Sequence, residues 1–352
     1  MVSMSVINLP HSVCKIVAEI GLTHEGSVGF AENFITSAKK SGADIIKFQM
    51  HNSEYESSSL EKFRVPFSFQ DKSRWDYWKR TSFTEENWLH LFDCVRRVNA
   101  ITQVTIFDVI GLNFCIEAGI TEIKLGSGDL RNEEILQELN ALRKRGKFFN
   151  LTISTGMATY SEIEATLAQL DSLIKEKSVT VMQCTSMYPT PLELVGINAM
   201  QEIQSRFRVD VGLSDHSRGI NAAIVAITRG ATRVEKHIVF DHKMFGPDIS
   251  SSIDFEELEL LCKFRNDYAL LSNKINKDEV SEKLSEQKMV FGRSLGLKQD
   301  FPSGHVLQVE DFCLRKPSGG FSWHERKKFV GLRLEQNYSS GELLTESHFT
   351  KP

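Results

Sequence analysis

The sequence contains no long hydrophobic run, and this absence excludes several classes of protein. Nothing approaches the ~18 consecutive apolar residues that cross a bilayer, so we expect no membrane partner. Residues 1–10 lack a basic region followed by an apolar run, which predicts no signal peptide and a cytoplasmic protein. Charge of one sign is not in excess either, since 42 basic and 46 acidic residues leave a net charge of -4. This balance argues against a nucleic-acid partner, and an anionic ligand must then be bound by local cations.

Closely spaced cysteines are also absent. The scattered residues, none of them in a CxxC pair, are Cys14, Cys94, Cys115, Cys184, Cys262 and Cys313. We interpret them as buried thiols in a reducing compartment. A cysteine nucleophile is the alternative, and no local motif supports it.

What is present is an alternation of short apolar runs with helical patterns over the first ~270 residues, which is typical of βα units. The predicted strands are 15–20, 44–48, 101–107, 121–125, 148–153, 178–184, 207–213 and 232–238. Eight strands predict an α/β fold of the (β/α)8 TIM-barrel type. A doubly wound open sheet is the alternative. It would usually carry a Gly-rich phosphate loop after the first strand, and residues 21–26 (GLTHEG) are not one.

Helical patterns separate the strands. Residues 84–98 are an example, with Thr84 as N-cap, and similar patterns cover 30–41, 131–145, 160–175, 218–229 and 254–270. The aromatic-rich stretch 63–79 is predicted to form a lid or rim. We predict a catalytic barrel domain at 1–272, a polar linker at 273–288, and a small β-rich module with frequent turn signals at 289–352.

Polar side chains gather at one end of every predicted strand, where a barrel places its functional groups. Lys47 and Lys124 lie inside otherwise apolar strands. Because a buried lysine without an anion is costly, the pair favours a phosphate or carboxylate ligand. The alternative is a structural ion pair with a neighbouring carboxylate. The other candidates at strand ends are Gln49, Thr105, Phe107, Ser127, Asp129, Ser154, Ser186, Tyr188 and Ser214.

Two histidines close adjacent predicted strands. His216 and His237 could reach one divalent ion and leave positions open for water and substrate, although each could instead be a hydrogen-bonded core residue. Glu19 ends the first strand, where burial would raise its pKa and suit acid–base chemistry, unless it only pairs with a lysine. Asp248 follows the last strand and either contacts ligand or only forms a turn.

Together these segments resemble the sialic acid synthase family, which includes N-acetylneuraminate, legionaminic acid and pseudaminic acid synthases. The motifs, in order, are AEIG at 18–21, GAD at 42–44, KFQ at 47–49, KLGSGD at 124–129, STGM at 154–157, CTS at 184–186, YP at 188–189, GLSDH at 212–216, EKH at 235–237 and GPD at 246–248. In the tail, 293–295 (RSL) and 315–322 (RKPSGGFS) are similar to the family's antifreeze-like (SAF) domain.

The resemblance implies an enzyme that condenses phosphoenolpyruvate with an N-acylated amino sugar and releases phosphate. It implies catalytic roles for Glu19, Lys47 and Lys124, and a manganese or magnesium ion on His216 and His237. It further implies a homodimer with swapped antifreeze-like domains, in which Lys316 reaches a neighbour's active site. The residues that it assigns to the phosphate are Lys47, Lys124, Ser127 and Ser154; Ser186 and Ser214 would seat the ligand; Gln49, Asp129, Tyr188 and Asp248 would contact the sugar.

The chain departs from the family's pattern around the sugar. Lys316 replaces a usual arginine, and Arg315 beside it could take over the contact. Asp129, Ser186 and Thr23, which precedes His24, stand where glutamate, asparagine and asparagine are common. The accepting sugar is therefore either N-acetylmannosamine or a 2,4-diacylated trideoxyhexose.

Two other functions fit parts of the pattern. A 3-deoxy sugar acid synthase would act on a phosphorylated aldose, but should need further cations for the second phosphate. A non-catalytic sugar- or ice-binding protein would not need Glu19, both lysines and both histidines at one barrel mouth.

Overall fold

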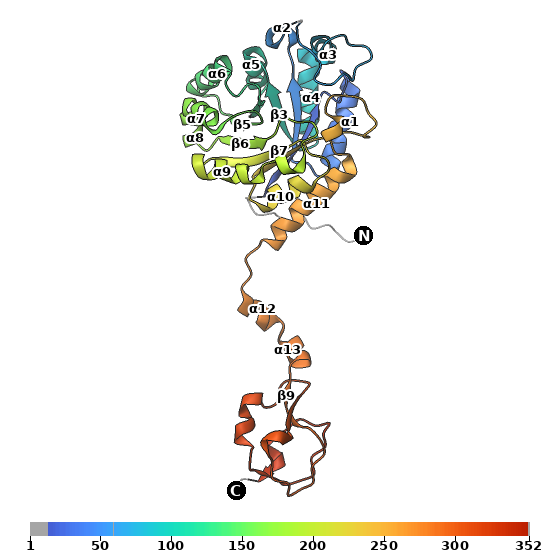
Figure 1. The fold of residues 1–352 in the computed structure, drawn as a ribbon, viewed down its shortest axis with the longest axis vertical. Coiled ribbons are helices and arrows are strands. Elements are labelled where there is room, and N and C mark those ends of the chain that lie inside the picture. The colour runs from blue at the N-terminus through green and yellow to red at the C-terminus, as the bar shows by residue number, and fades with distance from the viewer. Residues whose placement is uncertain (1–12, 59, 351–352) are drawn as a thin grey trace. The chain divides into compact units, whose positions relative to one another are not determined.

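The computed structural model describes residues 13–58 and 60–350. The chain divides into two compact units, one through Ser272 and the other from Asn273. The first unit is a closed barrel whose eight parallel strands are hydrogen-bonded in chain order, with β8 returning to β1 (Figure 1). Its strands are β1 (Lys15–Gly21), β2 (Ile45–Met50), β3 (Ile101–Ile106), β4 (Glu122–Leu125), β5 (Asn150–Ser154), β6 (Val179–Cys184), β7 (Asp210–Asp215) and β8 (Arg233–His237). The predicted TIM barrel is confirmed, and the open-sheet alternative is wrong.

Helices surround the strands (Figure 1). They are α1 (Val28–Lys40), α4 (Glu85–Arg97), α5 (Val109–Glu117), α6 (Glu133–Lys144), α7 (Tyr160–Gln169), α8 (Asp171–Lys175), α9 (Ile197–Phe207), α10 (Asn221–Thr228) and α11 (Phe255–Leu271). Thr84 caps α4 as predicted, since its hydroxyl accepts from the Asn87 backbone N–H at 3.3 Å. Among the described residues, no helix combines the length and apolarity that crossing a membrane requires.

Helices α5 and α9 were not predicted. The α5 sequence is a nearly continuous apolar run, whose period does not separate a helix from a buried strand. Helix α9 begins after Gly196, which adopts a left-handed conformation and offers no capping side chain. Asp108 does cap α5, since its carboxylate accepts from the Gly111 backbone N–H at 2.7 Å, so for α5 a capping signal was present and was missed.

The barrel core lies between the strands and the helices. Phe34 of α1, Phe48 of β2 and Leu91 of α4 are fully buried in it. Phe48 meets the ring of Trp88 edge-on at 5.7 Å, so apolar packing holds α4 against β2. Five of the six cysteines are buried thiols, as expected, and Cys313 is half-buried.

The connection from β2 to α4 is the longest of the connections at the carboxyl ends of the barrel strands, where the polar groups lie. It contains α2 (Ser53–Glu56) and α3 (Arg74–Thr81). Tyr77 and Trp78 of α3 pack with Leu22, Phe63 and Phe67 into a small apolar cluster of its own. This cluster holds the aromatic-rich segment against the barrel.

The second unit contains two short helices and two antiparallel strand pairs. The helices are α12 (Lys277–Lys283) and α13 (Ser285–Phe291), in and just beyond the predicted linker, and the strands are β9 (Ser294–Leu297), β10 (Phe312–Arg315), β11 (Arg333–Leu334) and β12 (Phe349–Thr350). The unit has its own core, which includes Leu295, Phe312, Leu334 and Tyr338. Short 3-10 turns join the elements of the chain at Leu192–Leu194, Ile249–Ser251, Val309–Asp311, Trp323–Lys328 and Glu346–His348.

Candidate active site

A cavity of about 610 Å³ opens at the carboxyl ends of the barrel strands. A TIM barrel places its active site at this end. The candidates that line it are Lys47, Gln49, Thr105, Phe107, Lys124, Ser127, Asp129, Ser154, Ser186, Tyr188, Ser214, His216, His237 and Asp248. The fold therefore brings every barrel candidate except Glu19 to one wall.

Four buried charges, the Lys–Glu quartet, lie at the base of this cavity. Glu19 is not on the wall that the described residues form, but pairs with Lys47, its register partner in β2. Lys124 contacts both carboxylate oxygens of Glu235 at 2.6 Å, and Lys47 Nζ lies 3.5 Å from Glu235 Oε1. Lys47 also donates to Thr105 Oγ1 at 2.9 Å. Both lysines thus form the structural ion pairs that were the alternative to ligand binding, and both also line the cavity.

Burial and pairing act in opposite directions on these groups. Burial alone would raise the pKa of Glu235, but Lys124 and Lys47 beside it lower that pKa to about 2. Burial lowers the pKa of Lys47 to about 7, against the opposing effect of Glu235. The Ser214 hydroxyl donates to Glu235 at 3.1 Å. An anionic ligand placed near Lys47 would favour its charged form.

A small cradle lies beside the quartet, where β5 ends. The backbone N–H of Gly156 donates to Ser127 Oγ at 2.9 Å. A Cβ at Gly156 would lie against Ser186 Oγ, 2.9 Å from Ser127 Oγ and 3.0 Å from Cys184 Sγ. Ser154 Oγ is buried and has no hydrogen-bond partner among the described residues. Glycine therefore keeps open a space lined by hydroxyls, which suits phosphate oxygens.

The two histidines lie next to each other on the lining of the cavity. Their ring centroids are 5.5 Å apart, and the Tyr188 ring stacks on His216 at 4.1 Å. His216 Nδ1 lies 3.1 Å from the Thr185 carbonyl oxygen, so Nδ1 carries the proton and Nε2 keeps its lone pair. His237 Nδ1 lies 3.9 Å from an Asp248 carboxylate oxygen.

Both imidazoles are in the neutral form that binds metal. Burial lowers the pKa of His216 to about 3 and that of His237 to about 4. His237 Nδ1 is buried without a hydrogen-bond partner among residues 13–58 and 60–350. A divalent ion would satisfy this nitrogen, so the donor set of two imidazoles and the Asp248 carboxylate fits a metal.

Arg64 reaches into the cavity from the segment between β2 and α3. It donates to Asp248 Oδ1 at 2.8 Å and to the Pro247 carbonyl oxygen at 2.9 Å. Its guanidinium lies 3.7 Å from the centre of the Tyr188 ring. Burial would raise the pKa of Asp248, but His237 and Arg64 lower it. The segment thus supplies a cation that contacts two sugar-site candidates.

An aromatic stack forms another part of the wall. The His51 ring lies between Trp78 and Phe107, with centroid separations of 4.5 and 4.1 Å. His51 also contacts Glu56 at 2.8 Å and Gln49 Oε1 at 3.2 Å. This rigid, partly apolar wall suits the carbon skeleton or acyl group of a sugar better than a second phosphate.

Asp129 lies on the cavity lining, next to α6. Burial raises the pKa of Asp129, whose carboxylate accepts from Asn132 at 3.2 Å.

Lys316, the candidate from the tail, lies in the second unit, with its Nζ 5.4 Å from the centre of the Phe291 ring. Arg315 donates to the carbonyl oxygens of residues 297 and 298 at 3.0 and 3.1 Å, which leaves it engaged within its own unit.

Comparison with known proteins places the chain in a family. The NeuB family model matches residues 34–276. The chain belongs to the NeuB family. It is thus an enzyme of the phosphoenolpyruvate-condensing synthases, and the sialic acid synthase resemblance is confirmed.

Individual relatives of this NeuB-family chain carry several product names. It is 30% identical over 336 residues to N,N'-diacetyllegionaminic acid synthase of Campylobacter jejuni, covering 94% of this chain and 98% of the relative. It is 28% identical to a pseudaminic acid synthase of the same species, covering 95% and 96%. The crystal structure of N-acetylneuraminic acid synthetase from Leptospira borgpetersenii in complex with citrate is similar, with a TM-score of 0.66 and 28% identity over 78% of this chain and 92% of that one.

Sequence reasoning did not single out Glu235, His51 or Arg64 as site residues of this NeuB-family protein. Glu235 carried a usable signal, because it is a carboxylate two residues before His237 on a predicted strand and so shares its face. His51 lies one residue beyond β2, where a strand-end search could have found it. No signal identified Arg64, whose position depends on the path of a long connection.

Proposed function

We propose that the chain is a nonulosonic acid synthase, which condenses phosphoenolpyruvate with the open-chain aldehyde of an unphosphorylated, N-acylated amino sugar. The observation that carries this proposal is the content of one cavity: two lysines that share Glu235, a hydroxyl-lined cradle at Gly156, and two neutral imidazoles. Family membership supports the reaction type, whereas the relatives' different names leave the sugar to experiment.

Phosphoenolpyruvate would occupy the side of the cavity near the quartet. Lys47, Lys124, Ser127 and Ser154 would bind its phosphate, with Ser186 and Ser214 seating the rest of the molecule. The quartet contains two lysines and two carboxylates, so it has little net charge of its own. A highly charged anion therefore needs a further cation close by.

His216 and His237 would hold that cation, with Asp248 beside them. Oxygen and imidazole donors accept manganese or magnesium, and such an ion would polarise the sugar aldehyde as a Lewis acid. The protein residues orient the reactants: Tyr188 supports His216 by stacking, and the Thr185 carbonyl fixes its tautomer.

The covalent step joins C3 of phosphoenolpyruvate to the aldehyde carbon. Positive charge then develops at C2, water adds there, and phosphate leaves with cleavage of the C2–O bond. Glu19 is the proposed proton carrier, because it is fully buried next to Lys47 and in register with His237. The pairing with Lys47, whose pKa burial lowers to about 7, provides a partner for such proton transfer near neutral pH.

The sugar would lie between the metal-binding histidines and the aromatic stack. Gln49, Asp129, Tyr188 and Asp248 would contact its hydroxyl and amide groups, and Thr105 and Phe107 would complete the wall. We also propose the second unit as an antifreeze-like domain of a swapped homodimer. Lys316 is then the basic residue for a neighbour's sugar, because Arg315 is engaged with carbonyl oxygens of its own unit.

Phosphate release from phosphoenolpyruvate tests the proposal. The assay uses manganese or magnesium, with and without chelator, across N-acetylmannosamine, 2,4-diacetamido-trideoxyhexoses and phosphorylated aldoses. Chelator-sensitive release with an unphosphorylated amino sugar supports the proposal and identifies the sugar class. Release only with a phosphorylated aldose would move the chain to the 3-deoxy sugar acid synthases, and binding of a sugar without release would favour a non-catalytic role.

A further inference from the structure

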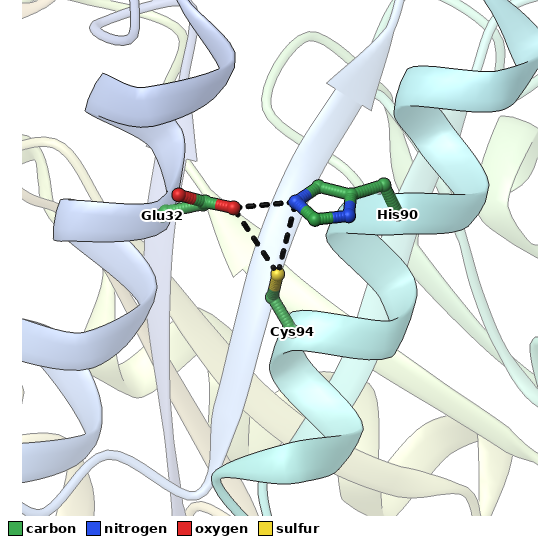
Figure 2. Close-up of side chains that lie close together, drawn as sticks. All are labelled: Glu32, His90 and Cys94. Carbon is green, nitrogen blue, oxygen red and sulfur yellow. Dashed lines mark hydrogen bonds and ion pairs between the residues drawn. The ribbon is translucent and has the colours of Figure 1, made fainter.

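Three side chains that commonly bind metals meet between α1 and α4, on the helical layer of the barrel (Figure 2). His90 and Cys94 are four residues apart on α4 and so share one face, while Glu32 projects toward them from α1. None of the three is on the active-site wall that the described residues form. We refer to them as the Glu32–His90–Cys94 cluster.

The separations in this cluster suit a tetrahedral ion. Cys94 Sγ lies 3.5 Å from His90 Nε2 and 3.6 Å from Glu32 Oε1. Zinc bonds of about 2.3 Å to sulfur and about 2.0 Å to nitrogen or oxygen place such ligand pairs about 3.5 Å apart. Glu32 Oε1 also hydrogen-bonds His90 Nε2 directly and would have to withdraw from it. Its side chain is 42% exposed, so the carboxylate has room to turn.

The charge around the sulfur also bears on metal binding. Burial raises the pKa of Cys94, and Arg97, which donates to Sγ at 2.8 Å, opposes that rise. Metal binding requires the thiolate, so a cation that favours the thiolate helps the proton to leave. Arg97 is an exposed residue on α4 and can release the sulfur to the incoming ion.

We propose that Glu32, His90 and Cys94 form a second metal site, for zinc or a similar thiophilic divalent cation, with its fourth position open to water. A thiolate–imidazole–carboxylate set selects zinc over the magnesium or manganese that oxygen-rich sites accept. The ion would cross-link α1 to α4, two neighbouring helices of the layer around the barrel. The expected effect is on stability, and it does not depend on the reaction proposed above.

Cobalt(II) titration of the full, chelator-treated chain tests this site, because cobalt–thiolate bonds add a near-ultraviolet charge-transfer band. Because the proposed active-site histidines would also take up cobalt, we expect the band to saturate within two equivalents, to disappear when zinc is added, and to survive added manganese. Cys94→Ser should abolish the band and His90→Asn should weaken cobalt binding at least tenfold. Zinc should raise the Tm of the wild type by more than that of either variant, because the proposed active-site metal site remains in all three.

Two cysteine variants provide the controls. Cys313→Ser removes a thiol in the second unit and should keep the band. Cys184 lies 3.6 Å from His216 Nδ1, so Cys184→Ser tests whether the thiolate belongs to the active site instead. A band that is lost in Cys184→Ser and kept in Cys94→Ser would overturn the proposal, as would the absence of any band in the wild type. If Cys94→Ser does not fold, the half-exposed His90→Asn decides between the same outcomes.

Discussion

Both carboxylate oxygens of Glu235 lie 2.6 Å from Lys124 Nζ. Glu235 Oε1 also lies 3.5 Å from Lys47 Nζ, so one carboxylate on β8 joins lysines from β2 and β4 across the barrel interior. This shared carboxylate sets both the spacing and the charge of the proposed anion site. The proposed anion site therefore depends on Glu235 as much as on the lysines.

Glu235→Gln should remove both activity and stability. The change leaves two buried lysines without their common counter-ion, which should lower the free energy of unfolding by about 3 kcal/mol. Turnover should fall at least about a hundredfold, because the lysines lose their position and Lys47 loses charge at neutral pH. Urea unfolding and phosphate-release assays measure the two effects.

Glu122→Gln is the matched control for that substitution. Glu122 is also a buried strand carboxylate, and it pairs with Arg233 without lining the cavity that the described residues form. The Glu122→Gln protein should lose a similar amount of stability, while its folded molecules should keep the wild-type turnover. Equal loss of turnover per folded molecule in both variants would show that Glu235 acts only through stability.

His237→Ala should abolish turnover and leave the fold intact, because it removes one proposed metal ligand without breaking an ion network. We expect at least a hundredfold loss and loss of manganese binding by isothermal titration calorimetry. His242→Ala alters a half-exposed histidine just beyond β8 and should change neither. Turnover by His237→Ala with saturating metal would mean that the two-histidine site is wrong.

Gly156→Ala should weaken phosphoenolpyruvate binding. Its Cβ would displace the Ser186 and Ser127 hydroxyls from the cradle, and we expect KM for phosphoenolpyruvate to rise about tenfold or more. Gly29→Ala, on α1 and outside the cavity lining that the described residues form, meets no atom within 4 Å and should leave KM unchanged. Steady-state kinetics with the sugar saturating compare them, and an unchanged KM in Gly156→Ala would remove the cradle from the phosphate site.

His24 should make the fold sensitive to acid. It is buried, stacks on Phe83 and accepts from the Gly26 backbone N–H at 3.0 Å through Nδ1. Burial, and secondarily His51, lower its pKa to about 3, whereas the unfolded chain titrates near 6.5. As pH falls below about 6.5 the unfolded state takes the proton first, so the contribution present at neutral pH is lost progressively toward pH 3.

His24→Asn isolates this effect because it keeps a side-chain acceptor and removes the titrating group. Near pH 5 the wild type should lose about 1.4 kcal/mol more per pH unit than the variant. Urea unfolding at a series of pH values measures the difference in slope. Parallel stability profiles for the two proteins would contradict the burial of a neutral His24.

The barrel was predictable because its strands are short, apolar and separated by amphipathic helices. The location of the site was then predictable from the strand ends, because the last residues of all the parallel strands lie at one end of the barrel. Helix α9 escaped because Gly196 gives it no capping side chain. The strands and the amphipathic helices were thus predicted from their local sequence pattern. The missing cap explains why α9 was not predicted.

The individual residues that line the cavity were harder to predict, because successive side chains of a strand point to opposite sides and only alternate ones reach the cavity. In the EKH motif, Glu235 and His237 face the cavity, while Lys236 between them pairs with Asp215 at 3.2 Å on the other side of β8. All three are buried, so polarity alone did not separate them. Arg64 depends on the folding of a long connection around Tyr77 and Trp78, which no short pattern specifies.

Product analysis by mass spectrometry is the sharpest test of the proposed condensation. Purified chain would be incubated with phosphoenolpyruvate, manganese and each unphosphorylated N-acylated amino sugar. The proposed condensation should yield an acid whose mass equals that of the sugar plus pyruvic acid, formed together with one inorganic phosphate and absent from the His237→Ala reaction. A product that retains phosphate from phosphoenolpyruvate, or phosphate release without carbon–carbon bond formation, would contradict it.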